Sequence, residues 1–368
     1  MEFFDKLVLP HSGANLEFLK FLLAVALIIF SIFSGVLLAS SFLSYIFLRK
    51  FRKSGRTNHW RLARDFADLI TTNKVMGIFL GVVPFTAVIM IYLQLLHETG
   101  SEAAGYMIFG FFMYIFGLSL IYIYKNTLHL NYFFNIFSKY GKDEADPDTT
   151  RDLEEYSSNS RIANSNSSIW GLIFLFLSIW FFTAANALAV DSAHWADAKS
   201  IFVILFSGAS IVNLLHFLTT SLSVAGAAFI VKYFYWDKRK YDDDNSDFRE
   251  DNYKSYSMKF CTTITLSFSV LQPVFFAINS SQSVISYTSL GIIFTILVLM
   301  SILIPLLYNS LKKNKFGSIT YAFYILLLIF AFITIREQSA FGTAIQGQIL
   351  TLAAEYEKSE KEGISQAG

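Results

Sequence analysis

The segment that decides the fold is Ile211–Trp236, IVNLLHFLTTSLSVAGAAFIVKYFYW. It is long enough to cross a bilayer, which takes about 20 consecutive apolar residues in a helix. A single histidine, His216, follows about one and a half helical turns after its start. Because an ionisable side chain inside a membrane span is costly, His216 is a candidate functional residue. The alternative is a neutral imidazole that is hydrogen-bonded to a serine or a backbone carbonyl of a neighbouring helix.

The composition is that of a membrane protein. Of the 368 residues, 54% are hydrophobic and 15% are charged, whereas soluble domains have about 25% charged residues. The net charge of +1 argues against a nucleic-acid partner. The one cysteine, Cys261, excludes an internal disulfide, a cysteine zinc site and a covalently attached c-type haem. We therefore expect an all-α polytopic protein that contacts the lipid bilayer.

Apolar runs predict eight transmembrane helices, and the first and fifth runs exceed the thickness of a bilayer. Prolines in the second and sixth runs (Pro84 and Pro273) are compatible with two four-helix bundles related by a parallel repeat. The predicted spans are Leu16–Leu48, Val75–Leu96, Ala103–Tyr124, Ile169–Val190, Ile211–Trp236, Met258–Ile278, Val284–Tyr308 and Phe316–Ile335.

Lysine and arginine gather in three connections, after the first, fifth and seventh predicted helices. Since cytoplasmic loops carry an excess of these residues, both termini are expected outside the membrane. Tryptophans near the predicted boundaries fit an interfacial position; they are Trp60, Trp170, Trp195 and Trp236.

The chain is thereby divided into four parts. Residues 1–125 hold the first three helices, and residues 169–336 hold the other five. Between them, residues 126–168 are expected on the cytoplasmic side, as an amphipathic segment followed by an acidic and Ser/Asn-rich linker. Residues 337–368 are expected to form a helical tail on the outer side.

Few other side chains indicate chemistry. The remaining histidines lie near water, where a solvated side chain is the simplest interpretation; they are His11, His59, His97, His129 and His194. No second histidine lies at the depth of His216, so the spans alone do not provide a bis-histidine haem site. Carboxylates are nearly absent from the spans, which argues against ion-coupled transport. We identify no catalytic residue.

The segment around His216, NLLHFLTTSLSVAGAAF, resembles the fifth helix of subunit I of cytochrome bd-type quinol oxidases, where a histidine ligates the low-spin haem b. The outside termini and the basic first connection are also similar to that family. Three further segments share the resemblance; they are NKVMGIFLGVVPF, GFFMYIFGLSLIYIYK and IREQSAFG. The resemblance implies a respiratory subunit of the bacterial inner membrane with periplasmic termini, and with cytochrome subunits and quinol as partners.

The sequence departs from that family at its cofactor sites. The stretch FLLAVALIIFSIF lacks the histidine that ligates the high-spin haem, and Tyr106 and Tyr114 stand where the third helix carries glutamates. The stretch ISYTSLG lacks the methionine of the low-spin site, and NSSQS replaces the long quinol-binding loop. The resemblance then implies at most one b-type haem, with His216 as an axial ligand of the haem iron, and no reduction of oxygen.

Three hypotheses follow. In the first, the chain passes electrons between quinol and a cytochrome partner on the outer side, through a haem b on His216. In the second, it is a cofactor-free membrane scaffold that anchors redox partners. In the third, it is an unrelated transporter, which the lack of charge within the spans disfavours.

Overall fold

The computed structural model describes residues 13–69, 74–96, 102–140, 146–190, 201–236 and 250–279, and short pieces between residues 291 and 309. The regular structure of these residues is helical throughout, as predicted. The helices are α2 (Gly13–Ser54), α3 (Thr57–Asp68), α4 (Lys74–Gly77), α5 (Val83–Leu96), α6 (Ala103–Tyr140), α7 (Pro147–Val190), α8 (Ile201–Leu205), α9 (Gly208–Ile230) and α10 (Glu250–Asn279).

Five of the described helices are long and apolar enough to cross a membrane. They contain the first five predicted spans, and α10 contains the sixth. The seventh span falls largely outside the described residues, and the eighth span, both chain ends and the tail 337–368 lie wholly outside them. The prediction of an all-α membrane protein therefore holds, while eight spans, the two bundles and the position of the termini stay predictions.

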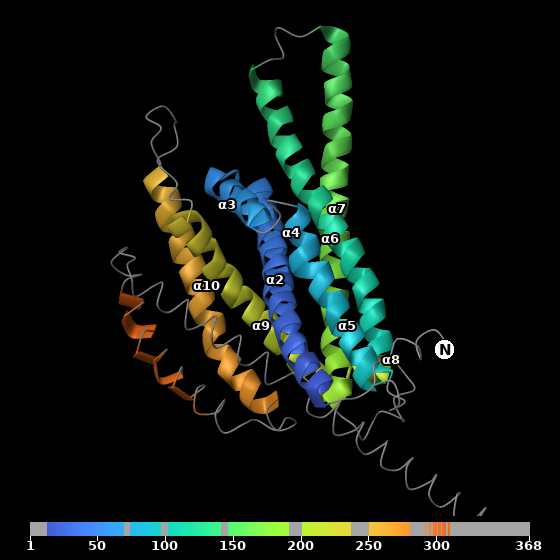
Figure 1. Ribbon diagram of the computed structural model, residues 1–368. Helices are drawn as coiled ribbons and strands as arrows, with labels where there is room; N and C mark the ends of the chain where they lie inside the picture. Colours follow the sequence, from blue (N-terminus) through green and yellow to red (C-terminus); the bar gives the residue numbers. More distant parts are fainter. Residues whose placement is uncertain are drawn as a thin grey trace, which may run out of the picture.

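Long helices that follow one another along the chain run in opposite directions (Figure 1). Helices α2, α6 and α9 run toward the end of the molecule where α3 lies, and α5, α7 and α10 run back. We call this end the basic side, because α3 and the end of α2 carry Arg49, Lys50, Arg52, Lys53, Arg56, Arg61 and Arg64. It is the side that the distribution of lysine and arginine predicts to be cytoplasmic.

Two aromatic-rich cores hold the helices together. The first joins α2, α5, α6 and α7, and at its centre the Phe30 ring lies 4.4 Å from that of Phe85 and 4.8 Å from that of Phe182. The second core joins α2, α3, α9 and α10 around Phe47, Phe66 and Phe229. Helix α2 contributes many residues to both cores and so connects them, as α6 and α9 also do.

Two of the predicted spans contain a π-helical turn. Residues Ile78–Val82 form such a turn between α4 and α5, just before Pro84. Since a proline has no N–H group and its ring clashes with the carbonyl group four residues earlier, a local widening of the helix relieves the clash. The fifth span begins after Ser207, whose side chain caps α9 by accepting from Ser210 N, and ends in a second π turn, Val231–Trp236.

The predicted linker in residues 126–168 is wrong. Helix α6 continues to Tyr140 and α7 begins at Pro147, so only residues 141–145 lie outside the described part. Pro147 suits a first helical position. The Ser/Asn-rich stretch faces α6, where Asn164 Nδ2 donates to Tyr124 O and to Thr127 Oγ1, both at 3.1 Å. Small polar residues are thus used to pack two helices closely, as in many membrane bundles.

The predicted amphipathic segment at the start of residues 126–168 is part of α6, and α6 and α7 lie side by side. They form a hairpin that projects past the other helices on the basic side (Figure 1). Exposed apolar side chains lie along it; they include Phe133, Ile136, Tyr156 and Ile162.

Candidate functional site

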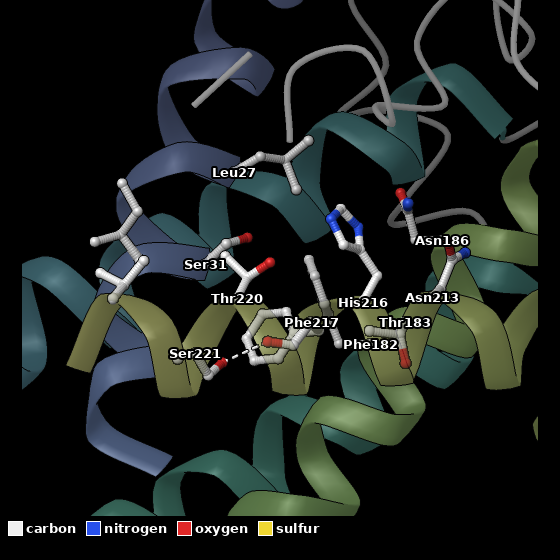
Figure 2. A pocket seen from close by; sticks show the side chains of 13 residues that line it. Leu27, Ser31, Phe182, Thr183, Asn186, Asn213, His216, Phe217, Thr220 and Ser221 are labelled. Atoms are coloured by element: carbon white, nitrogen blue, oxygen red, sulfur yellow. Dashed lines mark hydrogen bonds between the residues drawn. The ribbon is translucent and has the colours of Figure 1, made fainter. Parts of the chain in front are cut away.

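His216 lies inside the bundle, and its side chain is 4% exposed. It lines a cavity of about 60 Å³ between α2, α7 and α9. Figure 2 shows the imidazole ring between Leu27 of α2 and Asn186 of α7. Much of the lining is polar but uncharged; it includes Ser31, Thr183, Asn186, Asn213, Thr220 and Ser221.

The cavity-lining residues of α9 follow helical spacing. Asn213, His216, Thr220 and Val224 recur every three or four residues, which places them on one face of the helix. The hydroxyl group of Ser221 donates to the carbonyl group of Phe217 at 2.7 Å. The sequence therefore gives α9 one polar stripe, and the fold turns this stripe toward α2 and α7.

Close helix packing keeps the cavity small. Gly35 of α2 lies against α9, and a Cβ atom there would come within 2.7 Å of Ser221 Oγ. On the other wall, Tyr92 of α5 donates to Asn186 Oδ1 at 2.8 Å. Trp180 of α7 donates to the carbonyl group of Leu205 at 3.0 Å and so connects α7 to α8.

A haem does not fit beside His216 in this structure. Pockets that hold cofactor-sized ligands measure about 300–1,000 Å³, and this cavity measures about 60 Å³. Among the described residues its lining comes from α2, α7 and α9. A cavity of this size and polarity suits ordered water or direct hydrogen bonds between side chains.

A larger space lies nearby but excludes His216. A groove of about 480 Å³ runs between α2, α7 and α9, and is lined almost entirely by apolar side chains such as Phe42 and Leu172. Helix α9 contributes Leu218, Ser221 and Leu222 to it, and only Ser221 is shared with the cavity of His216. The larger space is therefore not the one that the imidazole ring faces.

A second polar site lies on the basic side, around two carboxylates of α3. Asp65 is 1% exposed, and its Oδ2 atom accepts from the Tyr253 hydroxyl group at 2.6 Å. Tyr233 donates to the backbone carbonyl group of Asp65 at 2.7 Å, and Arg64 Nε lies 3.7 Å from Asp65 Oδ1. These contacts connect α3 to the π turn that follows α9 (Val231–Trp236) and to α10.

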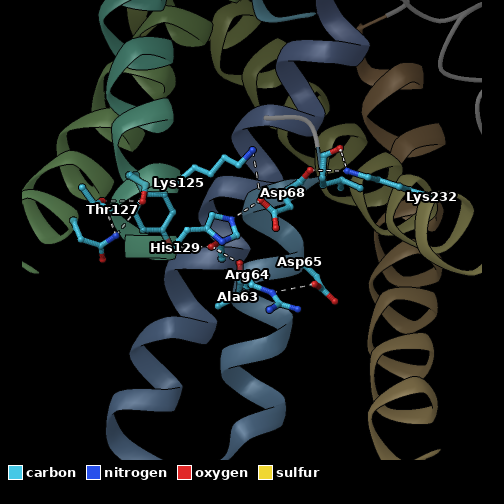
Figure 3. A network of polar contacts seen from close by, with 12 residues as sticks. Ala63, Arg64, Asp65, Asp68, Lys125, Thr127, His129 and Lys232 are labelled. Carbon is cyan, nitrogen blue, oxygen red and sulfur yellow. Dashed lines mark hydrogen bonds and ion pairs between the residues drawn. The ribbon is translucent and has the colours of Figure 1, made fainter. Parts of the chain in front are cut away.

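Asp68, one turn further on, connects α3 to α6. Its Oδ1 atom lies 2.9 Å from His129 Nε2 and 3.6 Å from Lys125 Nζ, and Figure 3 shows both side chains pointing toward it. Lys232 Nζ donates to the backbone carbonyl groups of Asp68 and Leu69 at 2.6 and 3.0 Å. Burial opposes ionisation of Asp68, but the hydrogen bond from His129 and the charges of His129, Lys125 and Arg64 outweigh it and lower its pKa.

We call Asp65, Asp68 and their partners the α3 cluster. Analysis of the sequence missed it, because both carboxylates lie within a basic connection outside the spans. The spacing was nevertheless informative: Leu62, Phe66 and Leu69 recur at helical intervals and predict a buried face, and Asp65 falls beside it.

Two of the histidines expected to be solvated lie in the described part, and one of them belongs to this cluster. His129 is 42% exposed and contacts Asp68. His59 Nδ1 lies 2.9 Å from Ser54 Oγ, and burial together with the charges of Arg56 and Lys50 lowers its pKa. His11, His97 and His194 lie outside the described residues.

The two tyrosines that stand in place of the family's glutamates lie on α6. Tyr114 is buried in the first core and accepts from Ser34 Oγ at 3.1 Å, whereas Tyr106 donates to Glu102 Oε2 at 2.9 Å. Within the described ranges, no three His, Cys, Asp or Glu side chains group as metal ligands. The sequence matches no family model and no curated protein.

Proposed function

We propose that the chain is a membrane scaffold subunit of a respiratory electron-transfer complex and that it holds no haem on His216. The observation that carries this proposal is the cavity of about 60 Å³ beside His216. Electron transfer through a haem b at this position would need a space about five or more times larger. The respiratory context rests on the resemblance to cytochrome bd-type oxidases.

In this proposal His216 is a structural group. It lies among hydroxyl and amide side chains from three helices, and such groups form hydrogen bonds across helices in membranes. The histidine then supports the packing of α9 against α2 and α7.

The α6–α7 hairpin supports a scaffold role. In this hairpin Phe133 and Ile136 of α6 are exposed, as is Tyr156 of α7. Exposed apolar side chains on helices outside the hydrocarbon region are typical of surfaces that contact another protein. The hairpin would thus bind a partner on the basic side. It would be a second binding surface, besides the one expected for a cytochrome at residues 337–368 on the outer side.

The experiment is a comparison of haem content before and after the chain is separated from its partners. The complex is purified in a mild detergent, the chain is isolated from it, and reduced-minus-oxidised spectra of both samples are recorded. We expect an alpha band in the complex and none in the isolated chain. The His216→Ala variant should leave the band of the complex unchanged, as should Ser31→Ala, a control in the same cavity.

Two results would contradict the proposal. An alpha band that stays with the isolated chain and disappears in His216→Ala, but not in Ser31→Ala, would assign a haem to His216. A chain that purifies without haem and without any redox partner would remove the respiratory context and favour an unrelated transporter.

A further inference from the structure

A further cavity, of about 450 Å³, lies on the basic side where the α6–α7 hairpin leaves the bundle. Four helices contribute to it, and none of its lining residues carries a carboxylate. The lining residues are Leu48, Phe51, Arg52, Trp60, Leu128, Asn131, Tyr132, Arg161, Ile162, Asn164 and Ser165. Its volume falls in the range of about 300–1,000 Å³ that is typical of ligand sites.

The residues of this cavity place it at the membrane boundary. Leu48 is the last residue of the first predicted span, and Arg52 follows about one helical turn later. Trp60 of α3 stacks on Tyr132 of α6, with ring centroids 4.4 Å apart and an interplanar angle of 27°. Because tryptophan and tyrosine favour the level of lipid headgroups, the cavity spans the border between hydrocarbon and headgroups.

One part of the lining is cationic. Arg52 from α2 and Arg161 from α7 are both exposed and line the same space. A guanidinium group binds phosphate oxygens through two parallel hydrogen bonds. The hydroxyl group of Ser165 and the amide NH2 group of Asn131 belong to residues that line the same space, and both are hydrogen-bond donors that suit a phosphate group.

The other part of the lining is apolar. Leu48 and Phe51 of α2 face the same cavity as Leu128 of α6 and Ile162 of α7. A free phosphate ion has no apolar part that could pack against these side chains. A phospholipid matches both parts, since its phosphate group suits the arginines and its acyl chain suits the apolar wall.

We propose that this cavity binds an anionic phospholipid, with its phosphate group between Arg52 and Arg161 and an acyl chain along Leu48, Leu128 and Ile162. The lipid would join α2 and α3 to the base of the hairpin. This inference is independent of whether the chain is a scaffold, because it depends only on the chemistry of the cavity.

The test measures lipid retained by the full chain after detergent delipidation and incubation with one lipid at a time, by native mass spectrometry. The probes are dioleoyl phosphatidylglycerol, which is anionic, and dioleoyl phosphatidylcholine, which is not. Each cation near the headgroup contributes about fivefold to the binding of an anionic lipid. Changing both residues, Arg52→Gln with Arg161→Gln, should therefore weaken phosphatidylglycerol binding by about 30-fold and abolish the preference over phosphatidylcholine.

The matched control is Arg49→Gln with Arg151→Gln. These residues are exposed on the same two helices and do not line the cavity, so less than a twofold change is expected. A third variant, Arg52→Lys with Arg161→Lys, keeps both charges and should keep the preference for phosphatidylglycerol. This variant and the thermal midpoint of each variant together show whether weaker lipid binding is caused by lost charge or by a destabilised fold.

Competition identifies the source of the phosphate group. Inorganic phosphate and acyl-free glycerol phosphate, at millimolar concentration, should displace little phosphatidylglycerol from the wild-type protein. Equal binding of the two lipids by the wild type would overturn the inference. An equal loss in the Arg49/Arg151 control, or full displacement by inorganic phosphate, would do the same.

Discussion

The cavity of His216 and the α3 cluster are both polar, but they are built differently. His216 lies among uncharged side chains of three long helices, in a space of about 60 Å³. The α3 cluster holds two carboxylates, and their partners come from α6, α10 and the turn that follows α9. His216 is thus recognised by its position within a predicted membrane span. The α3 cluster is recognised by the hydrogen bonds and ion pairs around its two carboxylates.

The difference has a physical cause. An uncharged imidazole needs only hydrogen bonds, which nearby hydroxyl and amide groups supply. A buried carboxylate needs cations and several donors, since a charge that is removed from water is costly unless it is paired. We therefore expect substitutions in the α3 cluster to affect stability more than substitutions at His216.

The largest effect is expected for Asp65→Ala. It removes the acceptor of the Tyr253 hydroxyl group at a position that is 1% exposed, and leaves buried donors unpaired. The free energy of unfolding should fall by about 3 kcal/mol. Titration with sodium dodecyl sulfate in mixed micelles measures it. Asp152→Ala, on the exposed face of α7, is the control and should change it by less than about 0.5 kcal/mol.

A second substitution tests how closely α9 packs against α10, at a position in the chain between His216 and the residues that contact the α3 cluster. Gly226 packs against α10, and a Cβ atom there would come within 2.7 Å of the Cys261 carbonyl oxygen. Gly226→Ala should therefore destabilise the protein by about 2 kcal/mol, because backbone must move. Gly105→Ala is the control, since no atom lies within 4 Å of its Cβ position. Equal stability of the two variants would contradict the observed approach of α9 and α10.

The sequence was informative where apolar runs are long. Composition and hydropathy predicted the helical membrane class, and each of the first five predicted spans lies within helical structure. Successive spans alternate in direction, as a chain that crosses the membrane repeatedly must, but this alternation does not say which helices meet in space: α2 and α9 run the same way and share the second core. The burial of His216 also agrees with its expected place within a span.

The prediction failed where polar residues serve packing. Ser160, Asn164 and Ser167 resemble a linker by composition, yet all are buried in α7. Only the opposing face of α6 explains this, and a single sequence does not show which faces meet. For the same reason, the sequence did not predict that His216 faces α2 and α7. The spacing of the polar residues defines one face of α9, but it does not say which helices cover that face.

A smaller effect is expected for His216→Ala. It removes a buried imidazole ring and enlarges a cavity whose lining is uncharged, so a loss of about 1.5 kcal/mol is expected. The same titration in mixed micelles measures it. A loss greater than that of Asp65→Ala would reverse the comparison between the two sites and would indicate that His216 has a stronger partner than the surrounding hydroxyl and amide groups.

The smallest effect concerns Asp68 and pH. Its pKa lies below the ordinary value of 3.8, so the folded state favours the ionised form. The stability that it contributes should be complete above pH 3.8 and should be lost as the pH falls through the lowered pKa. The side chain is 25% exposed and its contribution should be below about 1 kcal/mol, as for other partly exposed ion pairs.

The measurement is the difference in thermal midpoint between the wild type and Asp68→Asn, from pH 3 to pH 6. The difference should be constant at the upper end and should shrink toward the lower end, because the protonated carboxyl group and the amide are then equally uncharged. Asp152→Asn, at an exposed position, should give no such trend. A difference that grows as the pH falls would mean that Asp68 binds a proton more tightly in the folded state than in the unfolded state. Attraction between Asp68 and the cations around it would then not explain how α3 is held to α6.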